Sequence, residues 1–137
     1  MSLLSRFSIS VESALLRRFD EQIRSRGYPT RSKAIADLMR ESLVREEWRV
    51  GKEVTAAIIL VYDHHKRDLS NRLTRIQHDH YNLVVSSQHI HLDQDNCLEI
   101  VIVRGKPRGV EKLADRLRTL KGIKHASLAA ASTGRYL

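Results

Sequence analysis

The sequence has few aromatic residues and a single cysteine, and each shortage excludes something. Phe, Trp and Tyr make up 5% of the 137 residues. That is too few to suggest an aromatic platform for stacking the bases of single-stranded nucleic acid. Cys97 has no partner in the chain, so an intrachain disulfide is excluded. In a reducing compartment it is a free thiol, a metal ligand or a nucleophile.

Long apolar runs are also missing. The longest are Ala56–Tyr62 and Leu98–Val103, and both are far too short to cross a bilayer. Arginines at 6, 17 and 18 flank a short patterned stretch near the N-terminus, which is unlike the apolar region of a signal peptide. We therefore expect a cytoplasmic protein with no membrane partner.

Basic residues are in excess and unevenly spread. The formal net charge is +8. Residues 1–50 contain ten Lys or Arg and seven Asp or Glu. Residues 51–104 contain six basic and seven acidic residues, and residues 105–137 contain eight basic and two acidic residues. A basic balance favours a polyanionic partner, although on its own it does not decide the matter.

The first 49 residues predict a short strand followed by two helices. Residues 6–11 alternate between polar and apolar with period two, as a strand does. Leu15, Leu16, Phe19 and Ile23 then follow helical spacing up to Gly27, a typical helix stop. Thr30 is a good N-cap for a second helix that we expect to reach about Trp48.

A lone six-residue strand is not stable, so this one needs a partner. No other strand is predicted nearby, and the simplest partner is a second copy of the chain. The apolar faces of the two strands would then cover the helices. Their polar faces, carrying Arg6, Ser8 and Ser10, would form a two-stranded ribbon that fits the major groove of DNA.

The rest of the chain predicts a second domain of alternating strands and helices. After a linker at 49–53 come a strand at 54–62, a helix from 63 to about 77, a hairpin of strands 83–92 and 97–104, a helix at 110–120 and a strand at 123–131. The order βαββαβ is that of a ferredoxin-like domain. The chain is thus expected to be α+β, with domains at 1–49 and 50–137 and a tail at 132–137.

Three metal-ligating side chains fall on the predicted hairpin. His89 and His91 are two residues apart, so their imidazoles share one face of the strand. Cys97 follows a four-residue turn and returns towards them, which lets nitrogen and sulfur ligands converge on one ion. The best fourth candidate is His78, which lies outside the hairpin and could reach the site from a neighbouring subunit.

These residues stand in segments that resemble the nickel-responsive regulator (NikR) family. The segments are Gln77–His80, Gln88–His91, Asp95–Ile100 and His65–Leu69 in the second domain, and Arg6–Ser10 and Arg26–Ser32 in the first. Together the resemblance covers residues 5 to about 131. The hairpin pattern with its upstream Gln-His is specific, whereas the strand-helix-helix head is shared by many small repressors.

The resemblance implies a ribbon-helix-helix repressor with an ACT-type sensing domain. It implies a homotetramer, a dimer of dimers, which binds a palindromic DNA operator when loaded with nickel and represses nickel-uptake genes. One square-planar Ni²⁺ per subunit would be held by His89, His91 and Cys97 of one subunit and His78 of another. Square-planar coordination suits Ni²⁺ or Cu²⁺ and not the tetrahedral preference of Zn²⁺.

The resemblance also assigns roles around this centre. Arg6, Ser8 and Ser10 match base-reading positions, and Lys66 and Arg67 match basic positions that touch phosphate. Tyr62, Gln77 and Glu99 match residues that orient the metal ligands.

One position departs from the family pattern. Many members carry an acid where this chain has Lys33, and in some relatives that acid and the one matching Asp37 help to bind a cation between the domains. We expect the ammonium of Lys33 to replace that cation.

Two other functions fit parts of the sequence. A repressor of this kind could answer to another metal or to a small-molecule effector. A metalloenzyme would need an open metal position and a base, for which Glu99 is the nearest candidate. The DNA-binding head and four metal ligands argue against an enzyme. We expect the remaining histidines to be solvated, with secondary metal sites as the alternative: His64, His65, His80 and His125.

Overall fold

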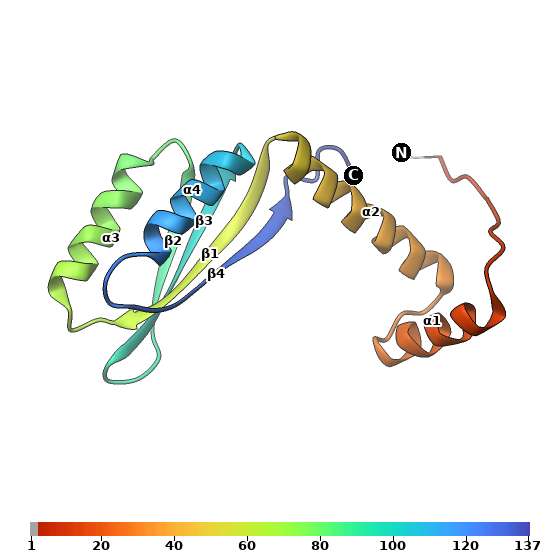
Figure 1. The fold of residues 1–137 in the computed structure, drawn as a ribbon, viewed down its shortest axis with the longest axis horizontal. Helices are drawn as coiled ribbons and strands as arrows, with labels where there is room; N and C mark the ends of the chain where they lie inside the picture. The colour runs from red at the N-terminus through yellow and green to blue at the C-terminus, as the bar shows by residue number, and fades with distance from the viewer. Residues whose placement is uncertain (1–2) are drawn as a thin grey trace. The chain divides into compact units, whose positions relative to one another are not determined.

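The computed structural model describes residues 3–137 and divides the chain into two compact units, one ending at Glu41 and one formed by Ser42–Leu137. None of the helices among the described residues is long and apolar enough to cross a membrane. The elements, shown in Figure 1, are α1 (Ser13–Ser25), α2 (Arg31–Val50), β1 (Val54–Asp63), α3 (Arg67–Asp79), β2 (Val84–His91), β3 (Asn96–Gly105), α4 (Pro107–Arg118) and β4 (Ile123–Ser132).

The segment before α1 differs from the sequence prediction. Residues 3–12 have no regular secondary structure, and the strand expected at 6–11 is absent. The physical reason is that a strand is defined by hydrogen bonds to a neighbouring strand, and one chain supplies none here. Phe7 and Ile9 consequently stay 63% and 61% exposed.

Helices α1 and α2 follow the predicted signals closely. Gly27 takes a positive φ of 80° after α1, which only glycine adopts readily. The Thr30 hydroxyl accepts a hydrogen bond from the Lys33 amide at 3.1 Å, so Thr30 caps α2 as expected. Arg31 donates two hydrogen bonds, of 2.8 and 2.7 Å, to the Asp20 carboxylate. These bonds link the start of α2 to α1.

The second helix is longer than predicted. It ends at Val50, where Gly51 turns the chain with φ of 81°. The linker expected at 49–53 is therefore only residues 51–53. The division between the two compact units falls within α2, at 41/42, and not after the helix.

The second unit has one four-stranded sheet of order β2-β3-β1-β4, in which every neighbouring pair is antiparallel. With α3 between β1 and β2 and α4 between β3 and β4, this is the expected ferredoxin-like fold. Helix α3 begins at Arg67, four residues later than predicted, and α4 begins at Pro107, three residues earlier. Proline is favoured in the first turn of a helix because its missing N–H is not needed there.

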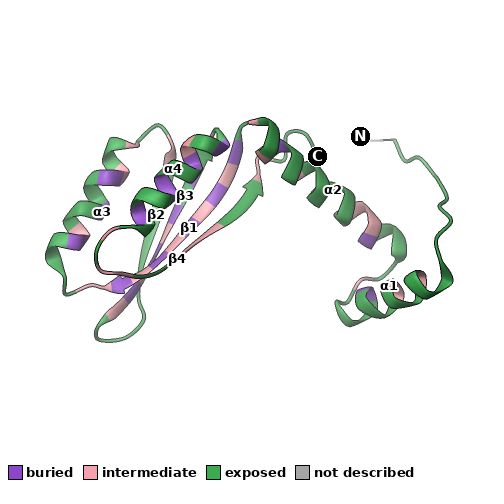
Figure 2. Ribbon diagram, in the orientation of Figure 1, coloured by how far each residue is buried: buried purple, intermediate pink, exposed green. Residues whose placement is uncertain are grey.

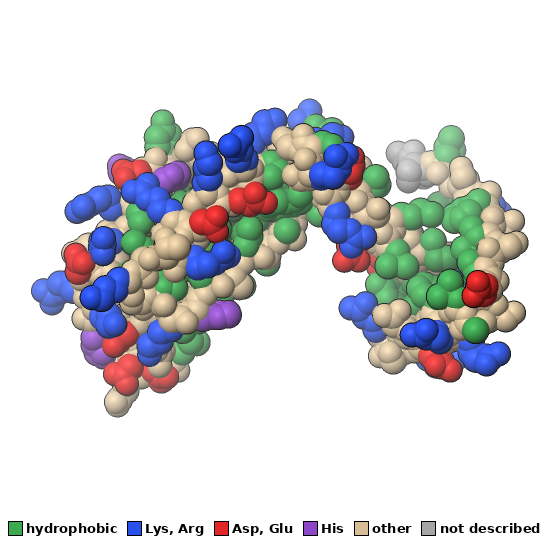
Figure 3. All heavy atoms as spheres, in the orientation of Figure 1, with side chains coloured by type: hydrophobic (Ala, Val, Ile, Leu, Met, Phe, Trp, Pro, Cys, Tyr) green, Lys and Arg blue, Asp and Glu red, His purple; other side chains and the backbone are tan. Residues whose placement is uncertain are grey.

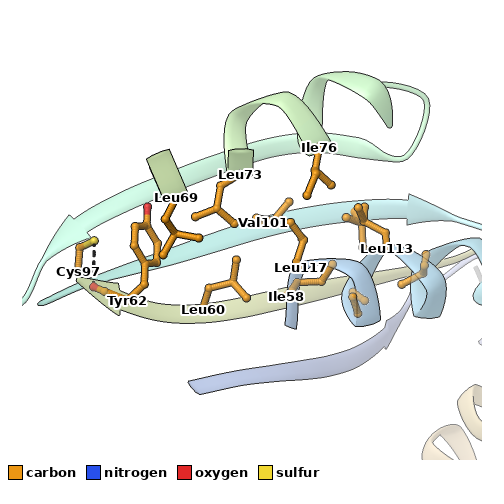
Figure 4. Close-up of a cluster of buried hydrophobic side chains, with 14 residues drawn as sticks. Ile58, Leu60, Tyr62, Leu69, Leu73, Ile76, Cys97, Val101, Leu113 and Leu117 are labelled. Atoms are coloured by element: carbon orange, nitrogen blue, oxygen red, sulfur yellow. Dashed lines mark hydrogen bonds between the residues drawn. The ribbon is translucent and has the colours of Figure 1, made fainter. Parts of the chain in front are cut away.

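Both helices cover the same face of the sheet, and the core lies beneath them (Figures 2 and 4). Residues of β1 alternate between buried and half-buried along the whole strand. The core between the sheet and the helices includes these fully buried side chains: Ile58 and Leu60 from β1, Val101 from β3, and Leu113 and Leu117 from α4. Removing such apolar surface from water is the main stabilising term for this unit.

We predict that Leu113→Ala lowers the free energy of unfolding by about 2–5 kcal/mol, since it leaves a cavity in a closely packed core. Leu113 is 0% exposed, whereas Leu137 is 48% exposed. Leu137→Ala is the matched control and should change the value by less than about 0.5 kcal/mol. Urea denaturation measures both, and equal losses in the two variants would contradict this description of the core.

Candidate metal centre

The hairpin of β2 and β3 brings His89, His91 and Cys97 onto one face of the sheet. His91 lies directly opposite Cys97, and His89 lies opposite Glu99. Directly opposed residues of an antiparallel pair point to the same side, with Cβ atoms about 4.5–5.5 Å apart. The two imidazole rings are 5.1 Å apart between centroids. The three predicted hairpin ligands are therefore neighbours.

The turn between the strands is built around the Asp93 carboxylate. It accepts hydrogen bonds from the amides of Asp95 and Asn96, at 2.8 and 2.7 Å, and from the Asn96 side chain. Chiefly through the Asn96 amide, these bonds lower the pKa of Asp93 to about 2. The carboxylate is thus ionised at neutral pH and keeps the turn closed.

Cys97 is fully buried at the start of β3 and packs against Tyr62 (Figure 4). Its thiol donates to the backbone carbonyl of Tyr62 at 3.5 Å. Burial raises the pKa of the Cys97 thiol, and the negative charges of Glu99 and Asp63 add to this shift. Without a metal the side chain is a protonated thiol, and metal binding has to displace that proton.

A partly buried chain of hydrogen bonds leads from α3 to His89. The Tyr62 hydroxyl donates to Glu99 Oε1 at 2.9 Å and lies 3.2 Å from His89 Nδ1. The Gln77 side-chain amide donates to the other oxygen, Oε2 of Glu99. Burial and the charge of Glu99 raise the pKa of Tyr62, so this hydroxyl keeps its proton.

These hydrogen bonds favour one tautomer of His89. The single proton of Tyr62 is used in the bond to Glu99, so the contact with His89 needs a proton on Nδ1 of the imidazole. The Nε2 atom of His89 then carries a free lone pair, which is the form that binds metals. Tyr62, Gln77 and Glu99, for which we expected an orienting role, are joined to His89 in this way.

Among the described residues, no hydrogen bond, ion pair or ring contact joins His78 to the hairpin. It lies in the last turn of α3 beside Gln77, and it is exposed. Successive helical residues are rotated by about 100°, so the two side chains leave the helix in different directions. Within residues 3–137 no group of three or more His, Cys, Asp or Glu is arranged to hold a metal ion. The donor types suit a soft or borderline ion, but the set is incomplete in the single chain.

His64 lies beside this cluster, whereas the sequence predicted a solvated side chain with a secondary metal site as the alternative. Its ring lies 5.0 Å from that of His91 and 4.1 Å from that of His65. The His64 Nδ1 atom is buried and has no hydrogen-bond partner among the described residues. His64 is therefore half-buried and not freely solvated, and only the pairing of the hairpin with the end of β1 reveals this.

The other expected histidines are held locally or exposed. His65 Nε2 lies 2.9 Å from the Gln94 carbonyl and 3.5 Å from the Asp95 carboxylate, so it contacts the hairpin turn. His80 Nδ1 lies 2.9 Å from the Ile76 carbonyl, and His125 is exposed on β4.

The expected DNA-contacting residues are all exposed. Arg6, Ser8 and Ser10 lie in the extended segment before α1, and Lys66 and Arg67 lie at the start of α3. In the first unit, Lys33 Nζ contacts Asp37 Oδ1 at 2.6 Å, and Arg40 contacts the same oxygen at 3.1 Å. The bond from Lys33 lowers the pKa of Asp37.

Comparison with known proteins identifies the family of the chain. Residues 55–131 match the family model described as the NikR C-terminal nickel-binding domain. Relatives with the provisional name nickel-responsive regulator include one from Syntrophus aciditrophicus, 47% identical over 98% of both chains. Another, from Geobacter sulfurreducens, is 50% identical over 96% of both chains.

A solved structure supports the fold alone. An uncharacterized protein from Thermotoga maritima aligns with a TM-score of 0.52 and 6% identity, over 58% of this chain and 98% of its own. The family model and the full-length relatives decide the classification, and the chain belongs to the nickel-responsive regulator family.

Proposed function

We propose that the chain is a transcriptional repressor that binds a palindromic operator when loaded with nickel and shuts down nickel-uptake genes in the cytoplasm. The observation that carries the proposal is the register of the hairpin, which sets His91 opposite Cys97 with His89 on the same face. The ligating groups are two imidazoles and one thiolate, a mixture that suits Ni²⁺ or Cu²⁺.

The fourth ligand is His78 from another subunit. Its exposure at the end of α3, apart from the hairpin of its own chain, supports an arrangement across an interface. Each subunit would then hold one Ni²⁺ in a square-planar site, and metal binding would be coupled to assembly of a homotetramer. With all four positions filled by protein, the site has no open position for a substrate, which favours a regulator over an enzyme.

The first unit supplies the DNA-binding head. An apolar hollow of about 410 Å³ is lined by α1, α2 and the extended segment. Its lining includes Ile9, Val11, Phe19 and Leu38, several of which are largely exposed in one chain. A second copy that pairs its residues 6–11 with these would cover the hollow. The pairing would also turn Arg6, Ser8 and Ser10 outward as a ribbon for the major groove.

Metal binding would act as an order switch. Filling a site that includes His78 of one subunit and the hairpin of another fixes the sensing core, and α3 with it. The arrangement of heads that matches the operator is then more populated. A ligand shifts such an equilibrium only by its differential affinity for the two states. Operator DNA must therefore strengthen nickel binding by the same factor.

We predict that titration with Ni²⁺ produces a thiolate-to-nickel absorption band that saturates at one ion per chain and is absent in Cys97→Ala. Ser87→Ala is the matched control, because Ser87 lies on the same strand and face but is not a ligand. It should keep the band. No band in the unmodified protein, or a band that survives Cys97→Ala, would reject the proposed ligand set.

We also predict that DNA binding by the nickel-loaded protein needs no added potassium. The Lys33 ammonium already lies 2.6 Å from the Asp37 carboxylate, and the family resemblance implies that some relatives bind a cation through acids at these two positions. Gel-shift titrations in buffers of increasing potassium concentration measure the cation requirement, and a buffer free of both sodium and potassium is the reference. Lys33→Glu should create a cation requirement, and a strong requirement in the unmodified protein would contradict the prediction.

A further inference from the structure

The seam between α3 and α4 carries two adjoining basic hollows. One, of about 290 Å³, is lined by Arg72, Arg75, Ile76, Arg116 and Leu120. The other, of about 350 Å³, is lined by Lys66, Arg67, Asp68, Leu69, Arg72 and Lys121. Arg72 belongs to both, so the two form one continuous surface, called here the helix-seam groove. Lys and Arg side chains gather over these helices in Figure 3.

The charge of this groove is almost unopposed. Among the residues that the structure describes, no acidic side chain lines the hollow formed by the three arginines. The one acid of the other hollow, Asp68, is 3.9 Å from Arg72 and 89% exposed. Among residues 3–137, Arg75, Arg116 and Lys121 make no ion pair. Like charges that converge without counter-charges repel one another, and an anion bound between them relieves that repulsion.

Close packing brings these cations together. At Gly122, just after Lys121, φ is +102° and an added Cβ would lie 2.9 Å from Leu69 Cδ2 and 3.8 Å from Lys66 Nζ. The turn after α4 therefore runs directly against the start of α3. Ile76 and Leu120 form an apolar floor on which the arginine stems can lie while their guanidinium groups face the solvent.

We propose that the helix-seam groove binds the phosphate backbone of double-stranded DNA. This extends the contacts proposed for Lys66 and Arg67 and rests on the proposed function. Arg67 and Arg75 are eight residues apart in α3, or about 12 Å along the helix axis. One DNA strand carries about one phosphate per 3.4 Å of duplex axis, so several fall within that length. A single small anion would fill one hollow and leave the other empty.

The test is the salt dependence of DNA binding by the full-length, nickel-loaded protein. The probe is a duplex of arbitrary sequence of about 40 base pairs, because phosphate contacts are independent of sequence. Arg75→Ala/Arg116→Ala should weaken binding and reduce the slope of log K against log salt by about 2, or roughly 1 per lost phosphate contact. Arg75 and Arg116 are exposed, so the double variant should fold and bind nickel normally.

The matched control is Lys106→Ala/Arg108→Ala, which removes the same charge from exposed positions outside both hollows. It should keep the unmodified slope. If the two double variants lose the same slope, or if Arg75→Ala/Arg116→Ala loses none, the groove does not bind DNA and the inference is wrong.

Two further outcomes separate the possible failures. In the first, Arg75→Ala/Arg116→Ala leaves duplex binding unchanged but abolishes the rise in melting temperature that inorganic phosphate gives the unmodified protein. The groove is then a small-anion site, and the inference is overturned while the proposed function stands. If the unmodified protein binds no duplex at all, with or without nickel, the proposed function fails together with the inference.

Discussion

The antiparallel register between β2 and β3 is the constraint on which the candidate site depends. A shift of one residue would send every side chain of β2 to the other face of the sheet. His89 and His91 would then point away from Cys97. The Asp93 carboxylate prevents this by holding the turn through the amides of Asp95 and Asn96. The proposed metal site therefore rests on a local hydrogen-bond network that contains none of the proposed ligands.

The same strand pairing buries the carboxyl group of Glu99, and its hydrogen-bond partners connect the site to α3. Glu99 is only 8% exposed, and a buried carboxylate is costly unless it is hydrogen-bonded. Tyr62 and Gln77 both donate to it, and His89 lies 3.6 Å away. Since Gln77 precedes His78 in α3, a disturbance of Glu99 also reaches the helix that carries the fourth proposed ligand.

The single chain leaves several groups unsatisfied in both units. The apolar hollow beside Ile9 and Val11 is open in the first unit. In the second, both carboxylate oxygens of Glu47 are buried without a hydrogen-bond partner among the described residues. The open apolar hollow is what a second copy could cover, whereas the Glu47 oxygens are already out of reach of solvent within one chain. The hollow therefore supports the proposal that the working form contains more than one copy.

Periodicity predicted most of the fold because the sheet has one covered face and the helices have one apolar stripe. The meeting of His89, His91 and Cys97 on one face was predictable for the same reason, since they are close in sequence and strand geometry fixes their side. Features formed by distant segments were not predictable. His64 meets His91 only through the pairing of the strands, and Arg116 meets Arg75 only because α3 and α4 share a face. The strand at 6–11 did not form because its partner is not in the chain.

The central claim is that each nickel ion joins two subunits, and mixing two inactive variants tests it most directly. His78→Ala keeps the hairpin ligands, and Cys97→Ala keeps His78. Neither variant alone should bind nickel with the thiolate absorption band. Unfolded together and refolded as mixed oligomers, they should recover part of the band, because a hairpin from one chain can meet His78 of the other. No recovery in oligomers shown to be mixed would place all the ligands in one chain and contradict the account.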